Sequence, residues 1–406
     1  METNQYLKMF EALKDNRKGE PSWLLRLREE AMASFAAQGF PTLKDDAWRY
    51  TDVAAIRESA FVCGAEPLQP VRLPAGARSL DFSEALKTFP ELLEKHLGRY
   101  AESEKNPFTA LNTALFQGGT FIRIPEGVVL KEPVRVVHSA SSDKIGVVFH
   151  PRALILMGKG SKAAVVETYA AGNGKNYFTN AVTEIVLEEG ARMEHCRVQQ
   201  ESSEAFHVAA TQVVQGRESS FVSFSLSTGA RLMRSDCRMA LSGEGASCEL
   251  NGLYLGDRDQ LLDQQTFVDH QKPDGKSGQF FKGLLAGNSR GVFRGHVMVR
   301  QDAQRTDAHQ TNKNLLLSDT AKVDTQPQLE ILADDVKCSH GAAVGQLQED
   351  ALFYLRSRGI GEKDAGRILA QGFAREVIER SSLNFMKETL LELVNEKLTD
   401  QLGSSS

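Results

Sequence analysis

The sequence contains few cysteines for its length. There are five among 406 residues, and no two of them form a C-x-x-C pair. They are Cys63, Cys196, Cys237, Cys248 and Cys338. An odd, scattered set of this kind argues against a disulfide framework and against a structural zinc finger. The sequence therefore predicts reduced thiols.

An excess of one charge and long apolar runs are also missing. The sequence has 48 Lys and Arg against 53 Asp and Glu, a net charge of -5, so it offers no dominant basic surface for a polyanion. No apolar run approaches the length of a membrane span, and the first residues are polar and acidic where a secretory signal would be basic and then apolar. We expect a soluble, cytoplasmic protein that binds neither nucleic acid nor membrane.

Residues 1–117 are predicted to form a mostly helical domain. The apolar spacing places one helix from Ser22, as its N-cap, to a stop at Gly39. We expect the aromatic loop at 48–51 to be pinned to a core, with a binding role left open. Between Cys63 and Ser79 the pattern weakens, which indicates a linker.

At Gly118-Gly119 the sequence changes to short alternating or β-branched runs bounded by turn residues, which indicate strands. A turn followed by small residues and a strand recurs at Gly160, Gly190, Glu218, Gly245, Ser289 and Thr320. The steps between these markers, by subtraction, are 30, 28, 27, 44 and 31 residues. Repeats of this length favour a β-solenoid, whose stacked coils bury a continuous apolar column, over a β-sandwich, which also has many short strands.

The predicted fold is mainly β, with a solenoid core over 118–345 between two helical domains. The long step, 257–280, is interpreted as an excursion that carries His270. Beyond the core the helical period returns, and it predicts a C-terminal helical domain over 346–402 and a frayed tail over 403–406.

The stretch from Asp334 to Ala343 contains the only Cys and His spaced two apart. In a β-strand, Cys338 and His340 would point to one side, while Lys337 and Ser339 would point to the other. A thiolate and an imidazole could hold half of an iron, copper or zinc site. The missing ligands would come from elsewhere in the chain, from another subunit or from a transient cargo. A partly buried free Cys beside a hydrogen-bonded structural His is the alternative, and it stays open.

Motifs of common enzyme classes fail in this sequence. The segment 158–160 follows an apolar run but departs from the phosphate-loop pattern at two positions. The adjacent acids Asp334-Asp335 could suggest a polysaccharide-cleaving solenoid, but neighbouring strand residues face opposite sides. The sequence has no G-x-S-x-G and no H-E-x-x-H motif. Packing or surface roles are expected for His195, Cys196 and His207.

Several longer motifs resemble a single family. They are Phe293-Arg294-Gly295, Asn312-Lys313-Asn314-Leu315-Leu316-Leu317, Val323 to Glu330, Ala333 to Gly341 and Phe353 to Ile360. Together they look like the core of the SufB/SufD family of bacterial SUF iron-sulfur cluster assembly proteins. Weaker similarity extends through Trp48 to Thr51 and Pro133-Val134. The Lys-Cys-Ser-His-Gly form of the motif, without a cysteine-rich N-terminal segment, favours the SufD branch over SufB.

The resemblance implies a right-handed parallel β-helix and a non-enzymatic scaffold subunit that works with SufB and the ATPase SufC. It implies that Cys338 and His340 lie at the SufB interface, at the end of the β-helix, and help to hold a nascent Fe-S cluster with a SufB cysteine. The C-terminal helical part, from about 353 to 402, would dock SufC.

From the same resemblance we expect no stably bound cofactor, and a homodimer of the isolated chain is left open. Two alternatives remain. One is a β-helix carbohydrate-active enzyme. The other is a purely structural interaction scaffold without metal contact.

Overall fold

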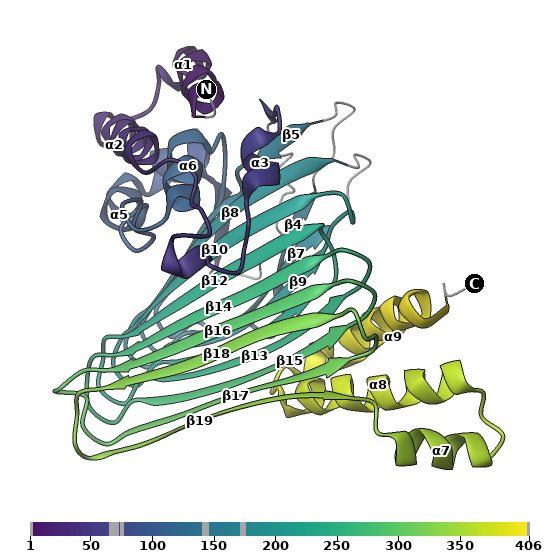
Figure 1. Ribbon diagram of the computed structural model, residues 1–406. Coiled ribbons are helices and arrows are strands. Elements are labelled where there is room, and N and C mark those ends of the chain that lie inside the picture. Colours follow the sequence, from purple (N-terminus) through teal and green to yellow (C-terminus); the bar gives the residue numbers. More distant parts are fainter. Residues whose placement is uncertain (1–2, 65–72, 74–76, 140–145, 171–175, 404–406) are drawn as a thin grey trace.

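The computed structural model describes residues 3–64, 73, 77–139, 146–170 and 176–403. Its core is a stack of two-stranded coils. Each coil gives one strand to each of two parallel sheets, so successive strands alternate between the sheets (Figure 1). The predicted mainly β fold, with a solenoid core and helices at both ends, is confirmed.

Two long sheets run through the stack. The first contains β6 (Arg152–Met157), β8 (Tyr177–Leu187), β10 (Phe206–Gln215), β12 (Leu232–Leu241), β14 (Leu261–His270), β16 (Arg290–Val299) and β18 (Lys322–Ile331). The second contains β4 (Val134–Ser139), β7 (Lys162–Ala170), β9 (Arg192–Gln200), β11 (Ser220–Ser227), β13 (Ser247–Gly256), β15 (Lys276–Leu285), β17 (Thr306–Leu316) and β19 (Val336–Gln346). At its start the first sheet also includes β1 (Val62–Cys63), β2 (Arg78–Asp81), β3 (Thr120–Ile124) and β5 (Val147–Phe149).

The coils have nearly equal lengths because the register is kept from one to the next. Leu232 pairs with Leu261, and Leu261 with Arg290, so each of these coils advances by 29 residues (261 − 232 and 290 − 261). The excursion predicted over 257–280 is therefore wrong. These residues include all of β14 and the turn that leads into β15, and they belong to an ordinary coil that contains His270.

Residues in the left-handed region mark the turns from the first sheet to the second. Gly160, Gly190 and Gly245 have φ values of 61°, 66° and 69°, which glycine adopts without a steric penalty. The next turn instead uses Asp274, with φ 60°. This turn was not used as a marker, and the next marker, Ser289, lies on the opposite edge, so about one and a half coils were counted as one long step of 44 residues. The markers at Ser289 and Thr320 lie in turns on the opposite edge of the stack.

Every second side chain of a strand fills the space between the sheets. Val165, Ile185, Met193, Val213 and Phe221 are each at most 1% exposed and belong to one apolar cluster that runs along the stack. Burying a side chain of this size stabilises a fold by about 1.5–3 kcal/mol. No single coil could build such a column, so the coils stabilise each other.

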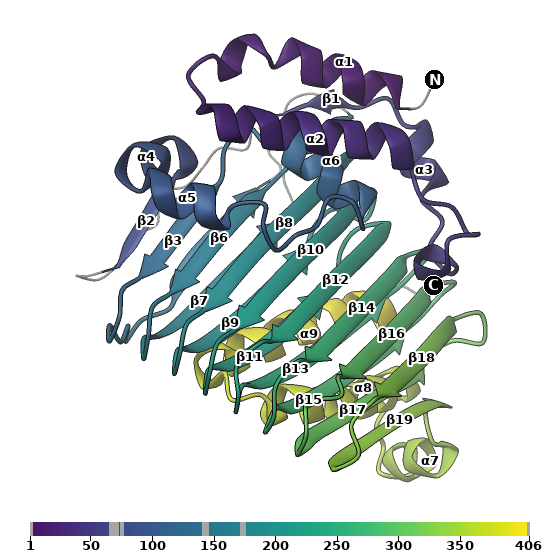
Figure 2. The same ribbon diagram turned by 90° about the vertical axis from the view of Figure 1, so that its left-hand side faces the viewer.

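The N-terminal helices cover the outer face of the first sheet near the start of the stack (Figure 2). They are α1 (Asn4–Ala12), α2 (Ser22–Gln38), α3 (Ala54–Glu58), α4 (Phe82–Thr88), α5 (Pro90–His96) and α6 (Pro107–Leu115). The helix predicted between Ser22 and Gly39 is confirmed, except that Pro21 rather than Ser22 occupies the N-cap position. Of the predicted linker, 65–72 and 74–76 lie outside the described residues, and its last two residues, Arg78 and Ser79, begin β2.

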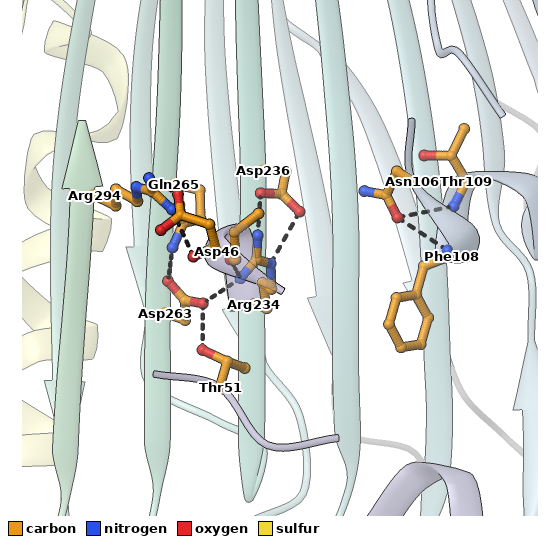
Figure 3. A network of polar contacts seen from close by, with 11 residues as sticks. Asp46, Thr51, Asn106, Phe108, Thr109, Arg234, Asp236, Asp263, Gln265 and Arg294 are labelled. Carbon is orange, nitrogen blue, oxygen red and sulfur yellow. Dashed lines mark hydrogen bonds and ion pairs between the residues drawn. The ribbon is translucent and has the colours of Figure 1, made fainter. Parts of the chain in front are cut away.

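The aromatic loop after α2 is fastened to the middle of the first sheet (Figure 3). Trp48 is buried, and the guanidinium of Arg234 lies 3.7 Å from the centre of its ring. Arg234 also pairs with Asp236 at 2.9 Å and with Asp263 at 2.8 Å. Asp263 in turn accepts a hydrogen bond of 2.5 Å from the Thr51 hydroxyl. The prediction that this loop is pinned to a core is confirmed.

The C-terminal helices are α7 (Glu349–Ser357), α8 (Glu362–Arg380) and α9 (Lys387–Gly403), and short 3-10 helices occur at Asp15–Arg17, Asp46–Trp48 and Asn384–Met386. α8 and α9 cover the outer face of the second sheet, where Val377 and Leu390 share an apolar cluster with Phe224 and Leu253 (Figure 1). Residues 404–406 of the predicted tail lie outside the described residues. Within the described ranges, no helix is long and apolar enough to cross a membrane.

Candidate metal site at the last coil

β19 is a strand, as predicted, and it is the last strand of the second sheet. The register places Cys338 beside Ala308 and His340 beside Gln310, and both of these neighbours are only 1% exposed, inside the stack. Cys338 and His340 therefore share the interior-facing side of β19, as the alternation predicted. Because no further coil follows in the described chain, the interior is open here. Cys338 is half-buried and His340 is exposed.

The thiol of Cys338 packs against the end of the apolar column. Burial raises the pKa of this thiol above its usual value of 9.0, a hydrogen bond involving the Ala308 backbone lowers the pKa, and the nearby charge of Asp307 raises it. At neutral pH the thiol therefore keeps its proton in the free chain. A metal ion that binds here has to displace that proton, since the thiolate is the ligand.

Cys338 and His340 would supply two ligands, and a structural metal site usually needs four. Across the described residues, no group of three or more His, Cys, Asp and Glu side chains is placed to hold a metal ion. The donor pair still suits a soft or intermediate metal ion such as iron, copper or zinc. The last coil thus offers half of a site, and the other ligands would have to come from outside the described chain.

The opposite side of the same strands carries a separate polar contact. The imidazole of His309 lies 2.7 Å from the Ser339 hydroxyl through Nδ1 and 2.8 Å from the Asp307 carboxylate through Nε2. The order of the groups, hydroxyl, imidazole and carboxylate, resembles that of a hydrolytic triad, in which the carboxylate is buried. Here the side chains of His309 and Asp307 are 58% and 43% exposed, so water competes with both contacts of the imidazole. We interpret this trio as a surface network.

The remaining cysteines and histidines mostly lie deep in the fold. Burial raises the pKa of Cys196 to about 12 and that of Cys237 to about 11. His195 and His207 are buried, and each lies beside a buried glutamate, His195 at 2.8 Å from Glu167. None of these groups reaches the open end of the stack, so Cys338 and His340 are the donors available there.

Both sheets end in a strand whose outer edge is unpaired in the described part of the chain, β18 in the first sheet and β19 in the second. Such edges carry free backbone N–H and C=O groups and readily pair with another chain. Apolar side chains accompany them, since Leu332 and Val344 are 54% and 49% exposed. Pro327 in the middle of β18 removes one backbone donor from its edge.

A groove of about 350 Å³ separates the last strands of the second sheet from α7 and α8. Val344, Leu347 and Phe373 are among its lining residues. α7 buries none of its residues, and its Phe353 and Tyr354 are 74% and 58% exposed. Exposed aromatic residues beside an apolar groove are typical of a protein-binding surface. Sequence reasoning singled out the aromatic pair within a motif but did not predict the groove.

Comparisons with known proteins are consistent with this architecture. The family model described as "SUF system FeS cluster assembly, SufBD core domain" matches residues 137–373, more than half of the chain. The model for the SufBD protein N-terminal region matches residues 1–69 and 61–136. The iron-sulfur cluster assembly protein SufD of Escherichia coli is 30% identical over 380 residues, which cover 89% of this chain and 90% of the relative.

Two further relatives cover a similar share of the chain. An iron-sulfur cluster assembly SufBD family protein of Synechocystis is 29% identical over 415 residues, covering 93% of this chain and 91% of the relative. The chloroplastic protein ABCI7 of Arabidopsis thaliana is 30% identical over 417 residues, covering 92% of this chain and 86% of the relative. The similarity therefore spans both helical ends as well as the solenoid.

Proposed function

Because the chain belongs to the SufBD family of iron-sulfur cluster assembly proteins, we propose that it is a non-catalytic SufD-type scaffold subunit that works in the cytoplasm. Its last coil pairs with a SufB-type subunit and presents Cys338 and His340 to a nascent cluster. The observation that carries the proposal is the position of these two residues. They face the interior at the C-terminal end of the stack, where β18 and β19 each have a free outer edge within the described chain.

The free edges favour pairing through backbone hydrogen bonds. β19 is 11 residues long and β18 is 10, so each could add a strand from a partner along most of its length. A partner that continued the stack would also cover the open interior. Its own ligands would then lie next to Cys338 and His340, and the cluster is cargo that needs donors from both subunits rather than a resident cofactor of either one.

The C-terminal helices are proposed to dock the SufC-type ATPase. α7 supplies the exposed Phe353 and Tyr354, and α8 fixes the helical unit to the second sheet. The groove between the last strands and these two helices is lined by Val344, which follows Cys338 by six residues in β19. A displacement of α7 would therefore act on the strand that carries the half-site.

The metal role is tested by replacing Cys338 and His340 with Ala, singly and together, in cells that mature an Fe-S enzyme through this pathway. We expect the double variant to lose maturation while the protein still co-purifies with its partners. Cys63→Ala and His309→Ala are matched controls, because Cys63 is also a half-buried free thiol and His309 lies on the outer side of the neighbouring strand.

Normal maturation by the double variant, with intact co-purification, would instead support an interaction scaffold without metal contact. The docking role has its own test, Phe353→Ser combined with Tyr354→Ser. We expect this variant to lose the ATPase from the purified complex and to keep the SufB-type subunit. Loss of both partners would contradict the assignment of separate surfaces.

A further inference from the structure

Inside the stack, a short column of hydrogen-bonding side chains runs up to the open end. Its positions follow the register of the second sheet from Gln279 to Gln310 and then to His340. The Gln310 side-chain amide donates to Oε1 of Gln279 at 3.2 Å, and the hydroxyl of Thr266 donates to the same oxygen at 2.6 Å. Gln279 thus accepts from both neighbours, while its own Nε2 has no hydrogen-bond partner among the described residues.

The oxygen of Gln310 has no hydrogen-bond partner among the described residues, although it is buried and its residue is only 1% exposed. A buried acceptor without a partner costs about 1–3 kcal/mol, so an isolated one requires an explanation. Because the amide nitrogen of Gln310 is directed back toward Gln279, its oxygen is directed toward the next coil. The residue beside it in that coil is His340.

The surrounding backbone is shaped for this amide. A Cβ atom at Gly295 would lie 1.7 Å from Nε2 of Gln310, so only glycine there lets the amide occupy its position. One coil further on, the register places Pro327 beside Gly295, just as it places His340 beside Gln310. Pro327 therefore faces His340 across the coil, and its side chain offers no hydrogen-bond acceptor. Gln310 is the side-chain acceptor that the register places directly beside His340.

Resting on the proposed function, we propose that Gln310 is a positioning residue for His340. When the imidazole of His340 turns inward to bind a metal ion, one ring N–H donates to Oε1 of Gln310, and the other ring nitrogen carries the lone pair that binds the metal. A ligating histidine usually makes such a hydrogen bond through its second nitrogen, which fixes the tautomer and the ring orientation. Removing partners of this kind typically weakens metal binding by about 10–100-fold.

The test uses Co²⁺ added to the full-length chain. Absorption reports the dissociation constant, and proton NMR reports the hyperfine-shifted, exchangeable ring N–H of a Co²⁺-bound histidine. Gln310→Met removes the acceptor and keeps the side-chain volume, and we expect it to raise the Co²⁺ dissociation constant about tenfold and to broaden or remove the N–H signal. Gln310→Glu keeps an acceptor, and we expect it to retain both the signal and the affinity.

Two further variants separate positioning from packing. Gly295→Ala displaces the amide without changing Gln310, and we expect it to reproduce the effect of Gln310→Met. Thr325→Val is the matched control, because Thr325 lies in β18 of the last coil and also carries a buried side-chain oxygen without a hydrogen-bond partner among the described residues. We expect Thr325→Val to behave like the wild type.

Equal Co²⁺ affinity and an unchanged N–H signal in Gln310→Met would overturn the inference and leave the metal role of Cys338 and His340 intact. Equal losses in Gln310→Met and Gln310→Glu would overturn it as well, because they would indicate a packing role. A wild-type chain that binds no Co²⁺ through Cys338 and His340 would overturn both the inference and the proposed metal contact. Normal Fe-S maturation by the Cys338/His340 double variant, beside the expected Co²⁺ results, would overturn the proposed function alone.

Discussion

An ion pair between Lys282 of β15 and Glu376 of α8 helps to fix α8 to the second sheet. We expect removal of Glu376 to destabilise this contact strongly and removal of Lys282 to change it little. Lys282 belongs to β15, and its side chain is fully buried under α8. Its ammonium donates a hydrogen bond of 2.7 Å to the Phe373 carbonyl, pairs with the Glu376 carboxylate and lies 3.9 Å from the Phe373 ring centre. The carboxylate of Glu376 is 53% exposed. One charge is therefore taken out of water while the other largely stays in it.

The pKa directions of the pair reflect this asymmetry. The hydrogen bond from Lys282 lowers the pKa of Glu376, whereas burial lowers the pKa of Lys282 despite the favourable contact with Glu376. At Lys282 the desolvation therefore outweighs the attraction to Glu376, so the intact pair is expected to add little net stability. Removing the carboxylate alone leaves a buried ammonium without its counterion, which is the costly case.

We expect Glu376→Ala to destabilise the docking of α8 by roughly 2–3 kcal/mol, less than the ~3–5 kcal/mol for a fully buried pair, because Glu376 is half in water and the Phe373 carbonyl remains. Lys282→Met should change the same free energy by less than about 1 kcal/mol, since it removes the buried charge and keeps the packing. The double variant should recover most of the loss caused by Glu376→Ala.

Hydrogen exchange of the α8 amides is a suitable assay, because both tryptophans, Trp23 and Trp48, lie in the N-terminal part and do not report on α8. Lys313→Met is the control, since Lys313 also reaches Glu376, at 3.4 Å, but is 41% exposed. The folded-state pKa of Glu376 lies below its usual value of 4.5, so its contribution is complete above that pH and disappears as the pH falls through the lowered value. A Lys282→Met variant as unstable as Glu376→Ala would refute this reasoning.

Three other substitutions test the fold. Trp48→Ala should destabilise the N-terminal part by about 3–5 kcal/mol, because it removes a buried ring stacked on Arg234, and urea unfolding followed by circular dichroism will check this. Glu218→Gly should raise stability by about 0.5–1 kcal/mol in the same assay, since Glu218 holds φ at 53°, where an L side chain is strained. Glu167→Gln should lower stability by about 2–4 kcal/mol at neutral pH. Burial raises the pKa of Glu167, but hydrogen bonds from His138 and His195 outweigh it and hold the pKa below its usual value of 4.5. The charge of Glu167 therefore stabilises the fold above pH 4.5, and the difference in stability between the wild type and Glu167→Gln should shrink as the pH falls below 4.5.

Local patterns were sufficient to predict the solenoid and the shared face of Cys338 and His340, because both follow from the two-residue period of a strand. They failed at the turn that contains Asp274, because this turn was interpreted as part of an excursion although Asp274 takes the same left-handed conformation as the marker Glu218. They also missed β2, which forms only because Arg78 to Asp81 pair antiparallel with β3.

Contacts set by the register or by distant chain segments were outside the reach of sequence patterns. The Thr51 hydroxyl meets Asp263 across 212 positions in the sequence. Gln310 comes to lie beside His340 only because β17 and β19 pair in one particular register. A shift of that register by one residue would place an outward-facing residue beside Gln310 instead of His340. The local sequence around Gln310 does not indicate which register forms.

Because the register is constant, the length of the stack is set by the number of its coils. Deleting residues 232–260, one repeat of 29 residues in the pairing of Leu232 with Leu261, would bring the last coil closer to the N-terminal helices by one strand spacing, about 4.8 Å. The faces of Cys338 and His340 would not change. The distance between the two ends of the scaffold is therefore set in whole coils, and related chains could alter the reach of their assemblies by gaining or losing coils.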